Sequence, residues 1–165
     1  MKSNGFTLLE LMVAMTILAI LLSIAVPSFS NLISSNRIEN QADNFLSSLA
    51  MARSEAIKLN QQVKLCKSSD GATCTTSGDW SVGWIIMDNS SNILQTYDGI
   101  PDGFTFSSTD LKDEVTFRPS GEITSTGGSI IICGPDGKEA DAHVVFLSAV
   151  GRPRREHGAT DCTAS

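Results

Sequence analysis

The feature that most constrains this chain is an apolar run near its beginning. From Phe6 to Val26 the only polar residues are Thr7, Glu10, Thr16 and Ser23. As a helix this run spans about 32 Å, close to the roughly 30 Å hydrocarbon core of a bilayer. A cleaved secretory signal has a shorter apolar core, several basic residues before it and a small-residue cleavage site. The sequence therefore predicts a transmembrane helix over residues 6–26.

Glu10 is the one charged residue inside this run. An ionised carboxylate within hydrocarbon costs roughly 2.5–3.5 kcal/mol on insertion scales, so it requires a partner. No basic residue lies within helical reach of Glu10 in the chain as written. The partner must therefore come from processing of the chain or from another subunit.

The segment G-F-T-L-L-E, residues 5–10, resembles the class III leader of type IV pilins and type II secretion pseudopilins. The resemblance implies that a prepilin peptidase removes residues 1–5 by cutting after Gly5 and methylates the new amino group of Phe6. It also implies that this amine pairs with Glu10 of a neighbouring subunit as helices join a filament. A buried charge is tolerable when it is paired, so the resemblance accounts for Glu10. An unprocessed membrane anchor is the alternative.

Residues 27–61 continue with a helical period and one apolar face. The predicted stripe consists of Phe29, Leu32, Ile33, Ile38, Ala42, Phe45, Leu46, Leu49, Ala56 and Ile57. Pro27 lies where pilins carry a helix-kinking proline, and A-R-S-E-A-I at 52–57 resembles the GspH/FimT branch of the pilin-like superfamily. We expect the helix to continue past Pro27 to about Asn60 and to lay its stripe on a globular head.

From residue 62 onward the pattern is typical of strands. Short runs rich in β-branched and aromatic residues alternate with turn signals, and they lie within 63–67, 80–88, 92–98, 104–108, 114–124, 128–133 and 142–150. This pattern predicts an antiparallel meander, with residues 62–165 forming the head. The expected fold class is α+β, a type IV pilin fold in which a long N-terminal helix, its first half transmembrane, packs on an antiparallel β-sheet.

The head contains all four cysteines of the chain, Cys66, Cys74, Cys133 and Cys162. An even number permits more than one pairing, and a head exported by this leader faces a compartment in which disulfides persist. Cys66 and Cys74 flank a short loop that contains glycine. We expect the pairs Cys66–Cys74 and Cys133–Cys162.

The chain carries no pattern of an enzyme. It has no G-x-S-x-G, no H-E-x-x-H and no Gly-rich phosphate loop, so neither catalysis nor a cofactor is expected. A zinc site built from Cys133, His143, His157 and Cys162 is the alternative to the second disulfide. No C-x-x-C spacing supports it.

A basic cluster, G-R-P-R-R, occupies residues 151–155. The net charge of −6 disfavours polyanions, so a polyanion would need such a local patch. Pro153 restricts the backbone and Gly151 can redirect it, which predicts a shaped loop whose guanidinium groups suit phosphate oxygens. The alternative is a solvated turn whose arginines pair with neighbouring carboxylates.

The G-R-x-R motif ahead of a cysteine is similar to the DNA-binding motif of FimT-type minor pilins, which take part in DNA uptake during natural transformation. The resemblance implies that Gly151, Arg152 and Arg154 bind double-stranded DNA, with Arg155 as a neighbouring charge. Lys138 is added as a candidate phosphate contact from its place in a turn signal.

Two further functions remain open: a structural minor pilin that primes pilus assembly without DNA, and a GspH-like pseudopilin of type II secretion. In all three functions the expected partners are the prepilin peptidase and other major and minor pilins or pseudopilins. The expected location is the bacterial inner membrane, with the head in the periplasm, and then the cell surface within a pilus.

Overall fold

The computed structural model describes residues 7–100, 103–108, 110–135, 137, 141–158 and 162, and of residues 25–32 it describes the backbone alone. The chain divides into two compact units, Met1–Asn36 and Arg37–Ser165. Helix α1, Leu8–Leu59, continues past Pro27 and contributes to both units. Each unit is described by itself.

In the first unit, α1 exposes its large apolar side chains between Leu8 and Ile24. Their exposed fractions run from 49% at Val13 to 77% at Leu8. The hydroxyls of Thr16 and Ser23 donate to carbonyls three residues earlier, at 2.8 and 2.7 Å, so these two side chains are satisfied within the helix.

Within the described part of the chain, no helix is both long and apolar enough to count as a membrane span. The predicted span begins at Phe6, which lies outside the described residues, and ends at Val26, whose side chain is not described. The transmembrane assignment therefore stays a prediction.

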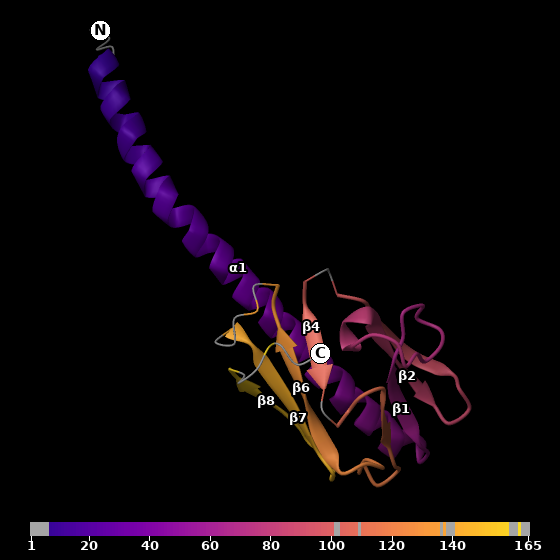
Figure 1. Ribbon diagram of the computed structural model, residues 1–165. Coiled ribbons are helices and arrows are strands. Elements are labelled where there is room, and N and C mark those ends of the chain that lie inside the picture. The colour runs from indigo at the N-terminus through magenta and orange to yellow at the C-terminus, as the bar shows by residue number, and fades with distance from the viewer. Residues whose placement is uncertain are drawn as a thin grey trace, which may run out of the picture. The chain divides into compact units, whose positions relative to one another are not determined.

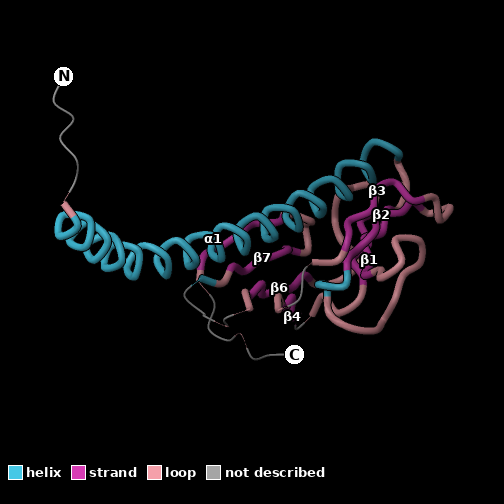
Figure 2. Tube along the Cα trace, turned by 90° about the horizontal axis from the view of Figure 1, so that it is seen from above, coloured by secondary structure: helices cyan, strands magenta, loops and turns pink. Residues whose placement is uncertain are grey.

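In the second unit the strands form two antiparallel sheets (Figure 1). The strands are β1 Val63–Lys67, β2 Gly83–Asp88, β3 Ile93–Asp98, β4 Thr105–Ser108, β5 Glu114–Phe117, β6 Gly127–Cys133, β7 His143–Ser148 and β8 Pro153–His157. One sheet has the order β3-β2-β1-β5 and the other β4-β6-β7-β8. A short 3-10 helix, η1, covers Trp80–Val82. In both views α1 after Asn36 runs along the two sheets (Figure 2).

The expected single meander is wrong. Strands β4 and β5 are consecutive in the chain, yet they belong to different sheets. The connection between them carries Leu111, which is buried and whose carbonyl accepts a hydrogen bond of 2.8 Å from the indole of Trp80. That anchor lets the chain cross from one sheet to the other.

The predicted stripe of α1 is confirmed at its centre, is wrong at Ile33 and Ile57, and is untested at Phe29 and Leu32, whose side chains are not described. The fully buried apolar residues follow spacings of four and three, and they are Ile38, Ala42, Phe45, Leu49, Ala52 and Ala56. By contrast, Ile33 is 41% exposed and Ile57 is 50% exposed. Ala52 and Ala56 continue the buried line to the end of the helix, so Ile57 falls on the flank of the stripe.

Aromatic rings form the centre of the core. The ring of Phe45 meets Trp80 and Trp84 edge-on at 5.2 Å between centroids, and Phe106 at 6.1 Å. Phe106 comes from one sheet and Trp84 from the other. Phe45 of α1 therefore joins both sheets in one core.

Both disulfides have the expected pairing. Cys66 is joined to Cys74 and Cys133 to Cys162, with Cα atoms 5.6 and 5.9 Å apart. The alternative zinc site is excluded, because the sulfurs of Cys133 and Cys162 are bonded to each other and supply no thiolate.

Residues 153–157, expected as part of a loop, form the edge strand β8. It pairs with β7 in a hairpin that places Arg154 opposite Phe146 and Arg155 opposite Val145. Proline is tolerated at the first residue of an edge strand, where its missing N–H breaks no ladder bond. The charged residues of P-R-R-E-H do not give the usual sequence signal of a strand, so β8 was not predicted.

Candidate functional site

The turn of the β7–β8 hairpin holds the glycine of the G-R-x-R motif. Gly151 has φ +73°, and its N–H donates to the carbonyl of Ser148 at 2.8 Å. A Cβ at this position would lie 2.0 Å from the carbonyl oxygen of Gly121. Both the left-handed conformation and the close approach therefore require glycine here, whether or not the turn binds a ligand.

Gly121 in turn is held by the helix. The Nε of Arg53 on α1 donates to the Gly121 carbonyl at 3.0 Å. The same oxygen thus contacts α1 on one side and the hairpin turn on the other. Arg53 belongs to the A-R-S-E-A-I segment, and this contact gives that arginine a structural role.

Strand alternation sends the two arginines of β8 to opposite faces of the sheet. Arg154 lies on the outer face, where its Cζ is 4.4 Å from the ring centroid of Phe146 and its guanidinium forms an ion pair with Glu156. Its side chain is 64% exposed. Arg154 is therefore accessible, but it is partly engaged by an aromatic face and a carboxylate.

Arg155 points toward α1. Its Nη2 donates to Glu39 Oε1 at 3.1 Å, and its Nη1 lies 3.0 Å from Asp43 Oδ1 as an ion pair without hydrogen-bond geometry. The side chain is only 27% exposed. The sequence treated Arg155 as a neighbour of the motif and missed Glu39 and Asp43, because nothing in the local pattern indicates a contact across 116 residues.

Arg152 follows the turn and is exposed. It borders an open depression of about 690 Å³ on the outer face of the sheet. The lining includes Arg152, Arg154, Phe146, Ser129, Ser148 and Asp110. The depression combines two guanidinium groups with hydroxyls, but Asp110 and the nearby Glu156 reduce its positive character.

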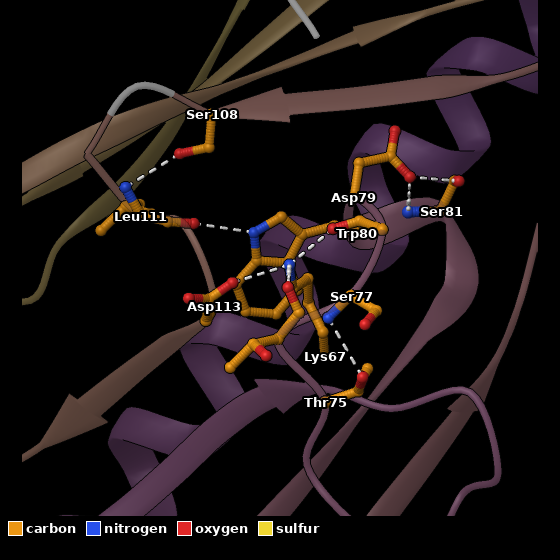
Figure 3. A network of polar contacts seen from close by, with 11 residues as sticks. Lys67, Thr75, Ser77, Asp79, Trp80, Ser81, Ser108, Leu111 and Asp113 are labelled. Carbon is orange, nitrogen blue, oxygen red and sulfur yellow. Dashed lines mark hydrogen bonds and ion pairs between the residues drawn. The ribbon is translucent and has the colours of Figure 1, made fainter.

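A second polar cluster lies at the ends of the two sheets (Figure 3). The Lys67 ammonium is buried, pairs with Asp113 Oδ1 at 2.7 Å and donates to the Gly78 carbonyl at 2.6 Å. The carboxylate of Asp79 accepts a hydrogen bond of 2.7 Å from the backbone N–H of Phe106. This bond satisfies a backbone donor of the edge strand β4. A cavity of about 700 Å³ borders this cluster, but its buried charges are all paired within the fold. We interpret it as structural.

His143 lies beside the Arg155 contact. Burial lowers the pKa of its imidazole, and the positive charges of Arg155 and His157 lower it further, while Glu39 opposes them. Its ring centroid is 4.9 Å from that of His157. Within the described residues, no group of three His, Cys, Asp or Glu side chains could hold a metal ion.

The remaining predicted site residues are distributed as follows. Gly5, Phe6 and Lys138 lie outside the described residues. Glu10 lies exposed in the first turn of α1, where its backbone N–H donates to the Thr7 hydroxyl at 3.2 Å. The roles of these four residues stay predictions.

The sequence profile of the family described as "Type II transport protein GspH" matches residues 41–151. The chain belongs to this family. A second profile, "Prokaryotic N-terminal methylation motif", matches residues 1–26 of this GspH-family chain. The family is structural and not enzymatic, and together with the methylation motif it makes the chain a pilin-like subunit.

Solved structures show the same fold for the GspH-family chain. The type IV minor pilin FimU of Pseudomonas aeruginosa is 24% identical, with a TM-score of 0.64 over 77% of this chain and 96% of FimU. The minor pseudopilin EpsH of Vibrio cholerae is 13% identical, with a TM-score of 0.52 over 77% of this chain and 98% of EpsH. These likenesses support the expected α+β pilin fold. No curated protein gives a significant match.

Proposed function

We propose that this GspH-family chain is a structural minor pilin of a type IV pilus. In this function the leader is cut after Gly5, the amine of Phe6 is methylated, and the mature subunit leaves the inner membrane to pack into the filament through the first half of α1. One observation carries the proposal, the exposure of every large apolar side chain described between Leu8 and Ile24.

An exposed apolar surface of this kind requires a cover. A large apolar patch on a soluble protein marks an interaction surface, and each buried Å² contributes about 25 cal/mol. A bilayer can cover the helix before assembly, and helices of other pilins can cover it afterwards. Glu10 is the one ionisable group in this surface, so its pairing with a neighbouring amine would favour one register between subunits.

The test uses the full-length chain in a pilus-forming bacterium that lacks its own minor pilin of this kind. The mature mass reports cleavage and methylation, and the amount of the chain in sheared pili reports assembly. Glu10→Gln is expected to reduce incorporation about tenfold or more, because the replacement cannot pair with a charged amine. Asp98→Asn, which removes an exposed carboxylate from β3, is the matched control. Equal incorporation of both variants would contradict the proposed role of Glu10, and recovery only with a type II secretion system would favour the pseudopilin function.

A second candidate function is the binding of double-stranded DNA. The observation that favours it is the position of Arg152 and Arg154, which border the same open depression on an exposed face. The net charge of −6 and the ion pair between Arg154 and Glu156 weigh against strong binding. Each subunit is therefore expected to bind weakly and with little sequence preference.

This candidate is tested with the full chain in detergent and a short DNA duplex at about 50 mM and 200 mM salt. Binding that weakens with salt and is lost in Arg152→Gln/Arg154→Gln would support it. Arg37→Gln/Lys112→Gln, which removes two exposed positive charges outside the hairpin, is the matched control. Absence of binding at the lower salt would remove this candidate and leave the structural function.

A further inference from the structure

The three arginines of the hairpin are not equivalent. Arg152 and Arg154 border the depression on the outer face, whereas Arg155 bridges two carboxylates of α1. Glu39 and Asp43 are four residues apart on the helix, so without a cation between them they repel each other. A guanidinium with several donors can serve both carboxylates at once.

The local charge argues against Arg155 as a contact for an anionic ligand. One positive charge faces two negative charges within 3.1 Å, so the group as a whole carries no positive charge. A phosphate that approached Arg155 would meet Glu39 and Asp43 as well, and it would have to displace them.

The turn of the hairpin is linked to the same helix indirectly, through Gly121. The turn at Gly151 rests on the carbonyl of Gly121, which accepts from Arg53 of α1. Residues 43 and 53 are about 15 Å apart along a helix. The hairpin is therefore fastened to α1 at two distant points, one at its turn and one on β8.

We propose that Arg155 is a positioning residue that fastens β8 to α1, with Arg53 acting on the turn, and that Arg152 and Arg154 alone face an anionic ligand. The ligand class is a phosphate polyanion. This last part rests on the DNA-binding candidate, whereas the fastening role of Arg155 does not depend on it. A hairpin fixed in this way orders two arginine stems before a ligand arrives, which lowers the entropy cost of binding.

The fastening role is tested by thermal unfolding of the full chain in detergent. Arg155→Gln is expected to lower the melting temperature by about 3 to 6 °C, because it leaves two unpaired carboxylates four residues apart. Arg118→Gln makes the same change of charge at an exposed site, and it is expected to leave the melting temperature unchanged. The triple variant Glu39→Gln/Asp43→Asn/Arg155→Gln is expected to melt above Arg155→Gln, since the repulsion is gone. An Arg155→Gln protein as stable as Arg118→Gln would overturn the proposal.

The ligand part is tested by the salt dependence of binding to a short DNA duplex. Arg152→Gln and Arg154→Gln are each expected to reduce the slope of log K against log salt by about 0.9, the value for one lost phosphate contact. Arg155→Gln, measured well below its melting temperature, is expected to lower affinity about two- to tenfold with an unchanged slope. A slope reduced as much as in Arg152→Gln would identify Arg155 as a ligand contact and overturn its positioning role. If the unmodified chain does not bind the duplex, the DNA candidate fails, and the melting series alone decides the role of Arg155.

Discussion

Between Leu8 and Ile24, α1 exposes its large apolar side chains, whereas between Ile38 and Ala56 the same helix fully buries six apolar side chains and partly buries Leu46. The two segments share a helical backbone and an apolar composition, but their patterns differ. The first is apolar on all sides, and the second has one apolar face and one polar face. The comparison teaches that one head can cover a stripe, whereas a helix that is apolar all round requires a bilayer or several other helices.

The largest effect is expected at the centre of the buried segment. Phe45→Ala removes the ring that contacts both tryptophans of the chain, and it should cost about 3–5 kcal/mol of unfolding free energy. In the exposed segment, Leu18→Ala should change the stability of the head by less than about 0.5 kcal/mol. Urea unfolding of the full chain in detergent, followed by tryptophan fluorescence, measures both. A comparable loss in Leu18→Ala would break the comparison between the two segments.

The next effect concerns the disulfides, which occur only in the head. Chain-entropy arithmetic gives about 3.6 kcal/mol for the Cys133–Cys162 loop and about 2.5 kcal/mol for the shorter Cys66–Cys74 loop. Each pair is replaced by serine, and the two variants are compared in the same urea assay. A greater loss from the shorter loop would show that local packing, and not loop length, decides the contribution.

A smaller quantity is the difference between two glycine variants, one of them where the hairpin turn meets the loop that Arg53 holds. Gly158→Ala should cost about 1–2 kcal/mol, because φ is +84° but nothing lies within 4 Å of the added Cβ. Gly151→Ala should cost about 1–3 kcal/mol more, since its Cβ would lie 2.0 Å from the Gly121 oxygen. Thermal unfolding of the two variants compares them. Equal losses would mean that the turn shifts freely and that its contact with Gly121 is not tight.

The smallest expected effect is a dependence of the stability of the head on pH, caused by His143. Burial holds the pKa of His143 below its usual value near 6.5, so the folded state prefers the neutral ring. Above about pH 6.5 the neutral His143 ring makes its full contribution to the free energy of unfolding. As the pH falls further, the unfolded chain takes up the proton first and stability is lost down to the lower pKa of the folded state.

This expectation is measured by melting the full chain from about pH 7.5 to about pH 5. His143→Gln should lose less stability over this range than the unmodified chain. His157→Gln removes one of the positive charges that lower the pKa of His143, so it should reduce the pH dependence less than His143→Gln does. If His143→Gln and the unmodified chain lose the same stability as the pH falls, the loss is due to groups other than His143.

Much of the fold could be predicted because its signals are local. Short runs rich in β-branched and aromatic residues marked β1 to β7, and the spacing of three and four marked the buried line on α1. The expected disulfide pairing is also confirmed, although the sequence permitted other pairings. Strand β8 was missed because an edge strand tolerates proline and charge, so its composition resembles that of a loop.

The candidate site could be predicted only in part. The G-R-x-R motif indicated the hairpin turn, but its local pattern could not show that Arg154 would cover Phe146 while Arg155 faced Glu39 and Asp43. One signal was available, since alternate residues of a strand point to opposite faces. It could be used only once residues 153–157 were known to be a strand.

By itself the sequence determined the long helix, the character of its two halves, the antiparallel strands and the family, because periodicity and short motifs are properties of neighbouring residues. The tertiary structure alone decided the division into two sheets, the glycine requirement at residue 151 and the opposite orientations of Arg154 and Arg155. These depend on contacts between residues far apart in the chain, such as Arg53 with Gly121 and Arg155 with Glu39. Their energies exist only when the folded backbone brings the partners within hydrogen-bonding distance.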